Sequence, residues 1–192
     1  MQPLTVDEVR PPAAYEPVRA EARRQVIELK RHRRVALGEL ITLVFENRET
    51  VRGVLEELLR AERIEERERI AEEVEVFNTL IPGERELSAT MFLEITDPAE
   101  LAQRLSTLGG IERAVHLEVD ASRVETVHEE GRSRADRTSS VHYLRFRFTD
   151  EQRSTFLQSA EVTLVAEHEG YRARAVLTED QRTALAADLL GG

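Results

Sequence analysis

The stretch that decides the fold is residues 35–82, VALGELITLVFENRETVRGVLEELLRAERIEERERIAEEVEVFNTLIP. Its first part, Val35–Phe45, is rich in valine, leucine and isoleucine around one glycine, a pattern that predicts two short strands. From residue 48 to residue 64 apolar residues recur at the spacing of a helix, and residues 70–77 have the same spacing. The stretch therefore predicts strands that lead into two helices, the second of which ends before Pro82.

The residues before this stretch predict a basic amphipathic helix. Residues 1–15 are expected to form a turn and linker, because Pro11 and Pro12 stop a helix almost at once. From residue 17 onward apolar residues recur at helical spacing while arginines occupy the other faces, and the helix ends in the basic run 30–34. We expect these cations to complement the helix dipole and to stay solvated. A site for an anion or an acidic partner is the alternative.

The residues after this stretch predict a sheet with short helices. Strands are predicted at residues 89–95, 115–119, 124–127 and 141–148, and a hairpin at residues 161–177. Thr149 and Thr178 each follow a strand and precede acidic residues, which predicts two helix caps. The polar run 129–137 is expected to be a loop, and its arginines are an alternative site for an acidic surface.

Together these elements predict an α+β fold, in which a largely antiparallel sheet is covered by helices and preceded by the amphipathic basic N-terminal helix. We expect residues 1–15 to be a linker and residues 16–192 to form a single α+β domain. The basic helix and the acidic helix of residues 48–64 carry opposite charges, so they should pack together or lie on one face of the sheet.

Composition limits the classes of function. The chain has 192 residues and a net charge of -10, from 37 acidic and 27 basic residues, which argues against a nucleic-acid partner. It has no cysteine, which excludes disulfides, thiolate metal sites and a cysteine nucleophile within it. No apolar run approaches the about 18 residues of a membrane helix, and residues 1–5 lack the features of a signal peptide. We therefore expect a cytoplasmic protein that does not bind membranes.

The sequence lacks the motifs of common enzymes. It has no glycine-rich phosphate loop, no nucleophile elbow and no zinc-protease helix, which favours a non-enzymatic role. Carboxylates and histidines are the remaining candidates for chemistry. Projecting the apolar stripe of helix 48–64 forward places Glu62 on its buried face, whereas Glu56 should face solvent.

A second candidate lies in the strand at residues 141–148. The alternation of this strand places His142 on an apolar face. Carboxylate and imidazole are ligands of divalent metals, so Glu62 and His142 are an alternative metal site with redox or hydrolytic activity. A buried Glu62 that is paired with Arg48 or Arg145 is the favoured interpretation, because buried charges are usually paired.

Several short motifs are spread along the chain. They are Phe45-Glu46-Asn47-Arg48 with Thr50, Glu57–Ile64, Asn78 with Leu80-Ile81-Pro82, Ala89-Thr90 and Val141–Phe146. Together they resemble, nearly end to end, a bacterial family of roughly this length that is catalogued only as a domain of unknown function. Its genes often lie beside those of rubrerythrin and of an iron–sulfur oxidoreductase of the heterodisulfide-reductase or glycerol-3-phosphate dehydrogenase type. This resemblance implies a redox or oxidative-stress setting and assigns no activity. The family commonly has a tyrosine where this chain has Phe77, which counts against catalysis by that hydroxyl.

We therefore expect a non-enzymatic accessory protein that binds a protein partner in a bacterial redox system. As the resemblance implies, the partner would be an iron–sulfur oxidoreductase or a rubrerythrin-like protein. Homodimerisation through the complementary basic and acidic segments is compatible with this expectation. The alternative is a protein that binds a divalent metal. The candidate binding residues are Glu46, Arg48, Glu57, Glu62, Asn78 and His142, and the candidate metal ligands are Glu62 and His142.

Overall fold

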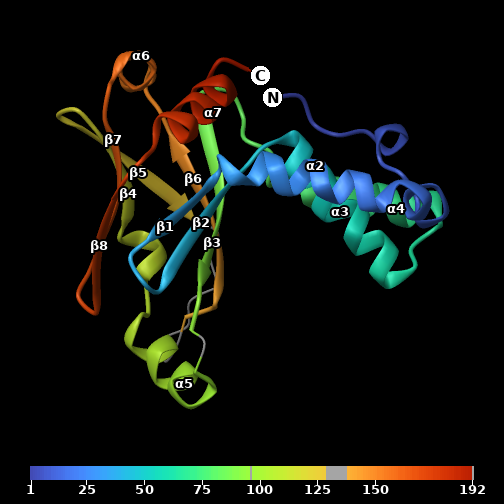
Figure 1. The fold of residues 1–192 in the computed structure, drawn as a ribbon, viewed down its shortest axis with the longest axis horizontal. Helices are drawn as coiled ribbons and strands as arrows, with labels where there is room; N and C mark the ends of the chain where they lie inside the picture. The colour runs from blue at the N-terminus through green and yellow to red at the C-terminus, as the bar shows by residue number, and fades with distance from the viewer. Residues whose placement is uncertain (96, 129–137, 192) are drawn as a thin grey trace.

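The computed structural model describes residues 1–95, 97–128 and 138–191, and it confirms the predicted α+β fold. A helical arm projects from one side of an eight-stranded antiparallel sheet, which curls into a nearly closed barrel (Figure 1). The barrel and the arm have separate hydrophobic clusters. Among the described residues, no helix combines the length and the apolar character that are needed to cross a membrane.

The described elements divide between the two parts of the molecule. The arm consists of η1 (Val6–Glu8), α1 (Pro12–Tyr15), η2 (Glu16–Val18), α2 (Arg19–Arg31), α3 (Arg48–Glu62) and α4 (Arg67–Asn78). The sheet consists of β1 (Arg34–Leu37), β2 (Ile41–Glu46), β3 (Glu86–Leu93), β4 (Val115–Val119), β5 (Ser122–His128), β6 (Val141–Arg147), β7 (Val162–His168) and β8 (Tyr171–Val176). The remaining helical elements are α5 (Pro98–Thr107), η3 (Ile111–Arg113), α6 (Asp150–Gln158) and α7 (Glu179–Leu189).

The strands follow the order β1-β2-β3-β6-β5-β4-β7-β8, and all neighbours are antiparallel. The two edge strands approach each other at Tyr171, whose hydroxyl donates to the carbonyl of Leu37 at 2.6 Å and accepts from the amide of Leu40 at 3.2 Å. Between these residues Gly38 has φ +70°, and a Cβ on it would lie 2.3 Å from the Tyr171 hydroxyl. Only glycine fits this conformation and this contact, so Gly38 allows the barrel to close.

Alternation along β6 sorts its side chains between the barrel interior and the outer face. His142, Leu144 and Phe146 are buried, whereas Tyr143 and Arg145 are half-buried on the opposite face. The predicted alternation is therefore confirmed. The hairpin of β7 and β8 is also confirmed. The predicted loop at residues 129–137 lies outside the described residues.

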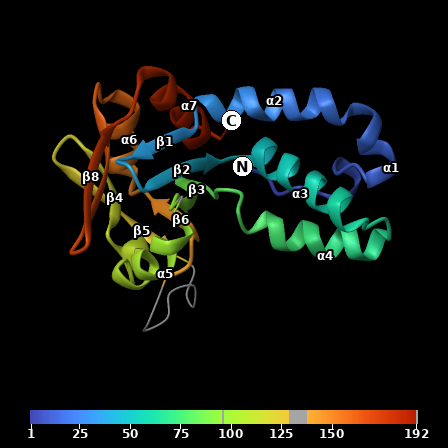
Figure 2. The same cartoon turned by 60° about the horizontal axis from the view of Figure 1, so that its bottom comes forward.

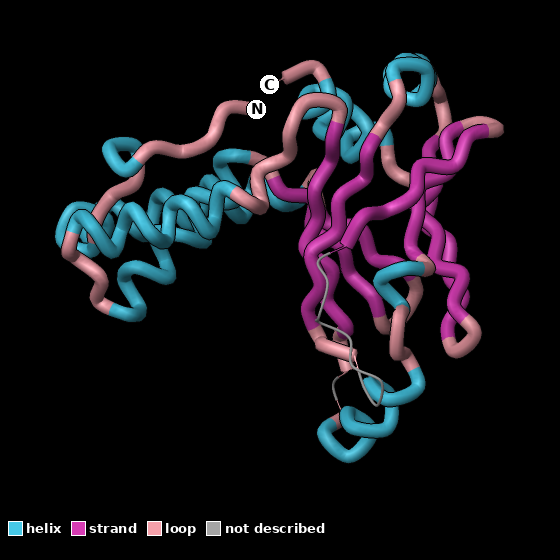
Figure 3. Tube along the Cα trace, turned by 180° about the vertical axis from the view of Figure 1, so that it is seen from behind, coloured by secondary structure: helices cyan, strands magenta, loops and turns pink. Residues whose placement is uncertain are grey.

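The arm is a layer of helices that stands beside the sheet (Figure 2 and Figure 3). Val51, Leu55 and Leu59 form the buried stripe of α3, and this stripe packs with α4 and with the N-terminal segment in the cluster of the arm. Residues 1–15 contain short helical turns, and Leu4, Val9 and Tyr15 are buried. The segment expected to be a linker is thus part of the arm, and the predicted boundary at residue 16 stays a prediction.

Candidate functional site

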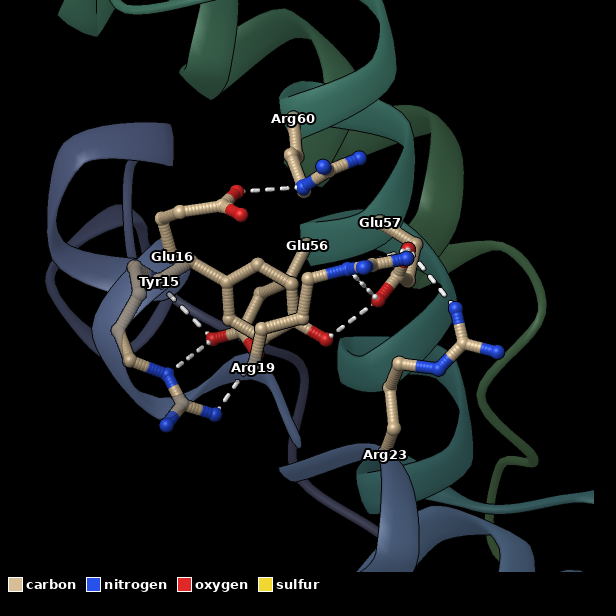
Figure 4. Close-up of polar contacts among 8 residues, drawn as sticks. Tyr15, Glu16, Arg19, Arg23, Glu56, Glu57 and Arg60 are labelled. Atoms are coloured by element: carbon tan, nitrogen blue, oxygen red, sulfur yellow. Dashed lines mark hydrogen bonds and ion pairs between the residues drawn. The ribbon is translucent and has the colours of Figure 1, made fainter. Parts of the chain in front are cut away.

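Glu57 fastens α2 to α3 (Figure 4). Its carboxylate accepts hydrogen bonds from Arg19 Nε and from the Tyr15 hydroxyl, both at 2.9 Å, and Arg23 lies 3.6 Å away. The hydrogen bond from Arg19 holds the pKa of Glu57 below its usual value, although burial acts in the opposite direction. These ion pairs confirm that the basic and acidic helices pack together. Glu57, a predicted binding residue, therefore holds the arm together.

The neighbouring Glu56 corrects the prediction from sequence. It was expected to face solvent, but it is 1% exposed, and Arg10 donates to it from Nε at 2.8 Å and from Nη2 at 2.7 Å. The pKa of Arg10 is raised by its hydrogen bonds to Glu56, although burial opposes this. The N-terminal segment covers this side of α3, and helical periodicity cannot reveal a cover that comes from a distant segment.

A groove lies between the end of α4 and the outer face of β5 and β6. Its volume is about 420 Å³, within the range of roughly 300–1,000 Å³ that is typical of ligand sites. We call it the α4 groove. Its described lining residues are Val76, Phe77, Thr79, Leu80, Val127, His128, Tyr143 and Arg145.

The α4 groove is apolar along its helix side and mixed along its sheet side. Val76 is 60% exposed and Val127 is 44% exposed, so two branched apolar side chains face solvent at its opposite walls. The Nδ1 atom of His128 is buried without a hydrogen-bond partner among the described residues. An exposed apolar surface in a groove of this volume is typical of a binding surface.

Glu86 offsets much of the positive charge on the sheet side of the groove. Its carboxylate binds Arg145 Nη1 at 2.6 Å and Arg147 Nε at 2.8 Å, and it accepts from the amide of Gly83 at 3.1 Å. Burial alone would raise the pKa of Glu86, but these partners bring it below its usual value. The guanidinium of Arg145 is therefore already engaged beside the groove.

Glu46, another predicted binding residue, lies behind the groove. It is 6% exposed and accepts hydrogen bonds from the hydroxyls of Thr50 at 2.5 Å and Thr90 at 2.8 Å. It lines a smaller hollow that shares Tyr143 and Arg145 with the α4 groove. The two hydroxyls satisfy the carboxylate, so Glu46 fixes the junction of β2 and α3.

Arg48 and Asn78 hold the N-terminal segment in place. Arg48 Nη2 lies 2.5 Å from Glu8. A backbone hydrogen bond from Thr5, together with Arg48, lowers the pKa of Glu8 to about 2. Asn78 accepts from the amide of Leu4 at 2.7 Å and donates to its carbonyl at 2.9 Å. Both predicted binding residues thus make contacts within the arm.

Glu62 does not lie on a buried face, so that prediction is wrong. It is the last residue of α3 and is exposed. Arg63 adopts φ 56° and ends the helix, after which Ile64 fills the end of the arm's hydrophobic cluster. The helical period of the apolar stripe includes Glu62, but the helix ends at this residue, so no other part of the fold covers its side chain.

His142 lies inside the barrel, on the face of β6 opposite the groove. It is 1% exposed, its Nε2 lies 2.9 Å from the Thr138 hydroxyl, and its Nδ1 lies 3.9 Å from Glu112. The 15 residues of α3 span about 22 Å at 1.5 Å per residue, and this length carries Glu62 away from the sheet. The structure therefore does not bring Glu62 and His142 together. Among the described residues, no three histidine or carboxylate side chains are grouped so that they could hold a metal.

Sequence reasoning missed the α4 groove and the burial of His116. The groove forms where α4 meets two strands that follow it by about 50 residues or more, so no local sequence pattern predicts it. His116 is fully buried on β4, and neither of its ring nitrogens has a hydrogen-bond partner among the described residues. Its alternation with Val115 and Leu117 is typical of the solvent face of a half-buried strand, but the side chain is 0% exposed and its Nε2 lies 3.6 Å from Glu118.

Comparisons with known proteins place nearly the whole chain in one family. Residues 3–189 match the family described as "Protein of unknown function (DUF3501)". A crystal structure of a protein of unknown function from Burkholderia pseudomallei K96243 is similar, with a TM-score of 0.92 and 31% sequence identity over 98% of this chain and 100% of the other. No curated protein matches the chain. The resemblance to a domain of unknown function is thus confirmed, and the chain belongs to the DUF3501 family.

Proposed function

We propose that this protein is a non-enzymatic accessory protein that binds a protein partner through the outer side of the arm. The binding surface would be the glutamates at the end of α3 and along α4, which we call the acidic surface. Its residues are Glu62, Glu65, Glu66, Glu68, Glu72, Glu73 and Glu75.

The observation that carries this proposal is that the acidic surface has no partner within the described chain. None of its glutamates forms an ion pair with another described residue, whereas Glu56 and Glu57 are satisfied by arginines. Between residues 62 and 75 there are seven glutamates and only three arginines. Like charges held this close repel one another and do not stabilise the arm, but they attract a basic partner and speed its association.

The resemblance supplies the class of partner. Its gene neighbours suggest an iron–sulfur oxidoreductase or a rubrerythrin-like protein, which would place this chain in a bacterial redox or oxidative-stress system. A homodimer through the basic segment is less favoured, because Arg31 pairs with Glu28 and Arg33 pairs with Asp188 inside the same chain.

The test is binding between purified proteins. We would immobilise the chain and measure binding of the rubrerythrin-like protein and of the iron–sulfur oxidoreductase from the same genome at low and high salt. At least one should bind, and its affinity should fall at high salt because exposed charges are screened. The double variant Glu72→Lys and Glu75→Lys should bind about tenfold more weakly or worse, since it reverses the attraction.

The matched control is the double variant Glu161→Lys and Glu169→Lys. These glutamates are also exposed and form no ion pair with another described residue, but they belong to the barrel. This control should bind as the wild type does. The proposal fails if neither candidate binds, or if both double variants weaken binding equally.

A further inference from the structure

We propose that the α4 groove binds an apolar side chain from a basic segment of the partner protein. This inference rests on the proposed function and adds where the partner is anchored and what it presents. The acidic surface would attract the segment, and the groove would then select it by shape and polarity.

The apolar walls argue for an apolar anchor. Val76 and Val127 are among the exposed large hydrophobic residues of the described chain, and both line the groove together with Phe77 and Leu80. Burying one aromatic or leucine side chain against such walls is worth a factor of about ten or more in affinity. Binding hot spots in protein interfaces are commonly anchors of this kind.

The charge along the rim argues for basic flanking residues. Glu72 and Glu73 precede Val76 by four and three residues, so they lie on the same side of α4, one turn along the rim. Neither forms an ion pair with a described residue. On the opposite wall Arg145 is already bound to Glu86. An arginine or lysine of the partner thus gains more at this rim than an acidic side chain would.

The charge at the rim also argues for a polypeptide in place of a lipid. His128 lines the sheet side of the groove, but its Nδ1 is buried, so the polar contacts of a bound molecule must come from the rim. The carboxylates of Glu72 and Glu73 can instead pair with basic side chains of a bound segment while a neighbouring apolar side chain enters the groove. The same carboxylates would repel an anionic lipid headgroup, so a lipid would gain less at this rim.

The experiment uses a labelled synthetic peptide in which one phenylalanine is flanked on each side by arginines. Two further peptides replace the phenylalanine with alanine or the arginines with glutamates. Fluorescence anisotropy gives the affinities, and methyl NMR of the full chain locates the site. The phenylalanine peptide should bind about tenfold more tightly than the alanine peptide, and it should shift the methyl signals of Val76 and Val127. The glutamate peptide should not bind measurably.

Matched variants separate the effect of the groove from the effect of removing any two exposed valines. Val76→Ser with Val127→Ser removes one helix valine and one strand valine from the groove. Val54→Ser with Val176→Ser removes one of each elsewhere, at positions 41% and 58% exposed. The groove variant should lose the preference for phenylalanine over alanine and keep the salt-dependent part of binding. The control variant should keep the preference.

Equal affinity for the phenylalanine and alanine peptides would overturn the inference, as would shifts confined to residues outside the groove. If the glutamate peptide bound as tightly as the arginine peptide, the inference that basic residues flank the anchor would be wrong. If the purified partner binds the groove variant as well as the wild type, the anchor site is wrong while the proposed function stands. If no candidate partner binds at all, the proposed function fails first.

Discussion

Arg33 and Asp188, 155 residues apart in sequence, form a buried bidentate ion pair. Arg33 Nη1 lies 2.5 Å and Nη2 lies 2.8 Å from the two carboxylate oxygens, and the residues are 4% and 5% exposed. The pair ties the last helix, α7, to the chain between α2 and β1. Burial raises the pKa of Asp188 above its usual value, although Arg33 acts in the opposite direction.

Loss of Arg33 should therefore be costly at neutral pH. Arg33→Met leaves the Asp188 carboxylate buried without a counter-charge, and we expect the free energy of unfolding to fall by about 3–5 kcal/mol. Urea denaturation at pH 7 measures this change. The control Arg34→Met removes an exposed arginine 3.8 Å from Glu94, and it should change stability by about 0.5 kcal/mol at most. Equal effects of the two substitutions would contradict the prediction.

The stability of Arg33→Met should approach that of the wild type as pH falls. The folded-state pKa of Asp188 is raised, so its contribution to stability is present below the ordinary aspartate pKa of about 4 and is lost as pH rises through the folded value. Without Arg33 the folded-state pKa rises further, and the gap in stability between wild type and Arg33→Met should narrow as pH falls from 7 towards 5. A gap that stays constant over this range would show that Asp188 is not the group left uncompensated.

Glu56 should control how firmly the N-terminal segment is held. Besides the guanidinium, the backbone amide of Arg10 donates to Glu56 at 3.1 Å. Glu56→Ala should lower the free energy of unfolding by about 1–3 kcal/mol, because charge-assisted hydrogen bonds are lost, and should speed amide exchange at Arg10. Glu62→Ala on the same helix should leave both quantities unchanged, since Glu62 is exposed and makes no ion pair with a described residue. If the Arg10 amide stays protected from exchange in Glu56→Ala, Glu56 does not hold the N-terminal segment in place.

Helix caps and the alternation of strands could be predicted from the sequence. The threonines at residues 149 and 178 cap α6 and α7 through capping boxes with Gln152 and Gln181. The alternation of β6 also correctly divided buried from exposed positions, whereas the period of α3 predicted the helix but failed at Glu56 and Glu62. These features depend on neighbours within a few residues, which is the range that periodicity and capping rules describe.

Features formed by segments that are distant in sequence could not be predicted. The burial of Glu56 depends on Arg10, and the exposure of Glu62 depends on where α3 ends. The α4 groove is lined by Val76 from the arm and by Val127 from the barrel, which are two parts of the fold. No helical or strand period contains such information, so the candidate site could be assembled only from the structure.

Tyr15 should ionise far above the usual range of tyrosine. Burial and its hydrogen bond to Glu57 raise the pKa of Tyr15 to about 12. Because the folded-state pKa is raised, Tyr15 stabilises the fold fully below its ordinary pKa of about 10, and this contribution is lost as pH rises through about 12. The difference in ultraviolet titration between wild type and Tyr15→Phe isolates this transition. Glu57→Gln should move it to lower pH, and an unmoved transition would mean that Glu57 has no influence on it.

Tyr171 and Gly38 should act as one unit in closing the barrel. Tyr171→Phe removes the hydrogen bonds to Leu37 and Leu40, and we expect a loss of about 1–3 kcal/mol. The Leu40 amide should exchange faster, while the amide of Glu94, which donates to the Leu40 carbonyl at 2.8 Å, serves as an internal control.

Gly38→Ala should also be destabilising, because its Cβ would meet the Tyr171 hydroxyl and because φ +70° strains any residue other than glycine. In the double variant with Tyr171→Phe the clash is relieved but the backbone strain remains, so the two losses should sum to more than the loss of the double variant. Denaturation of the wild type, both single variants and the double variant measures this coupling. Strict additivity would mean that the hydroxyl and the glycine do not share a contact, and that the packing of Ala173 and Ala175 against the core holds the edges of the barrel together instead.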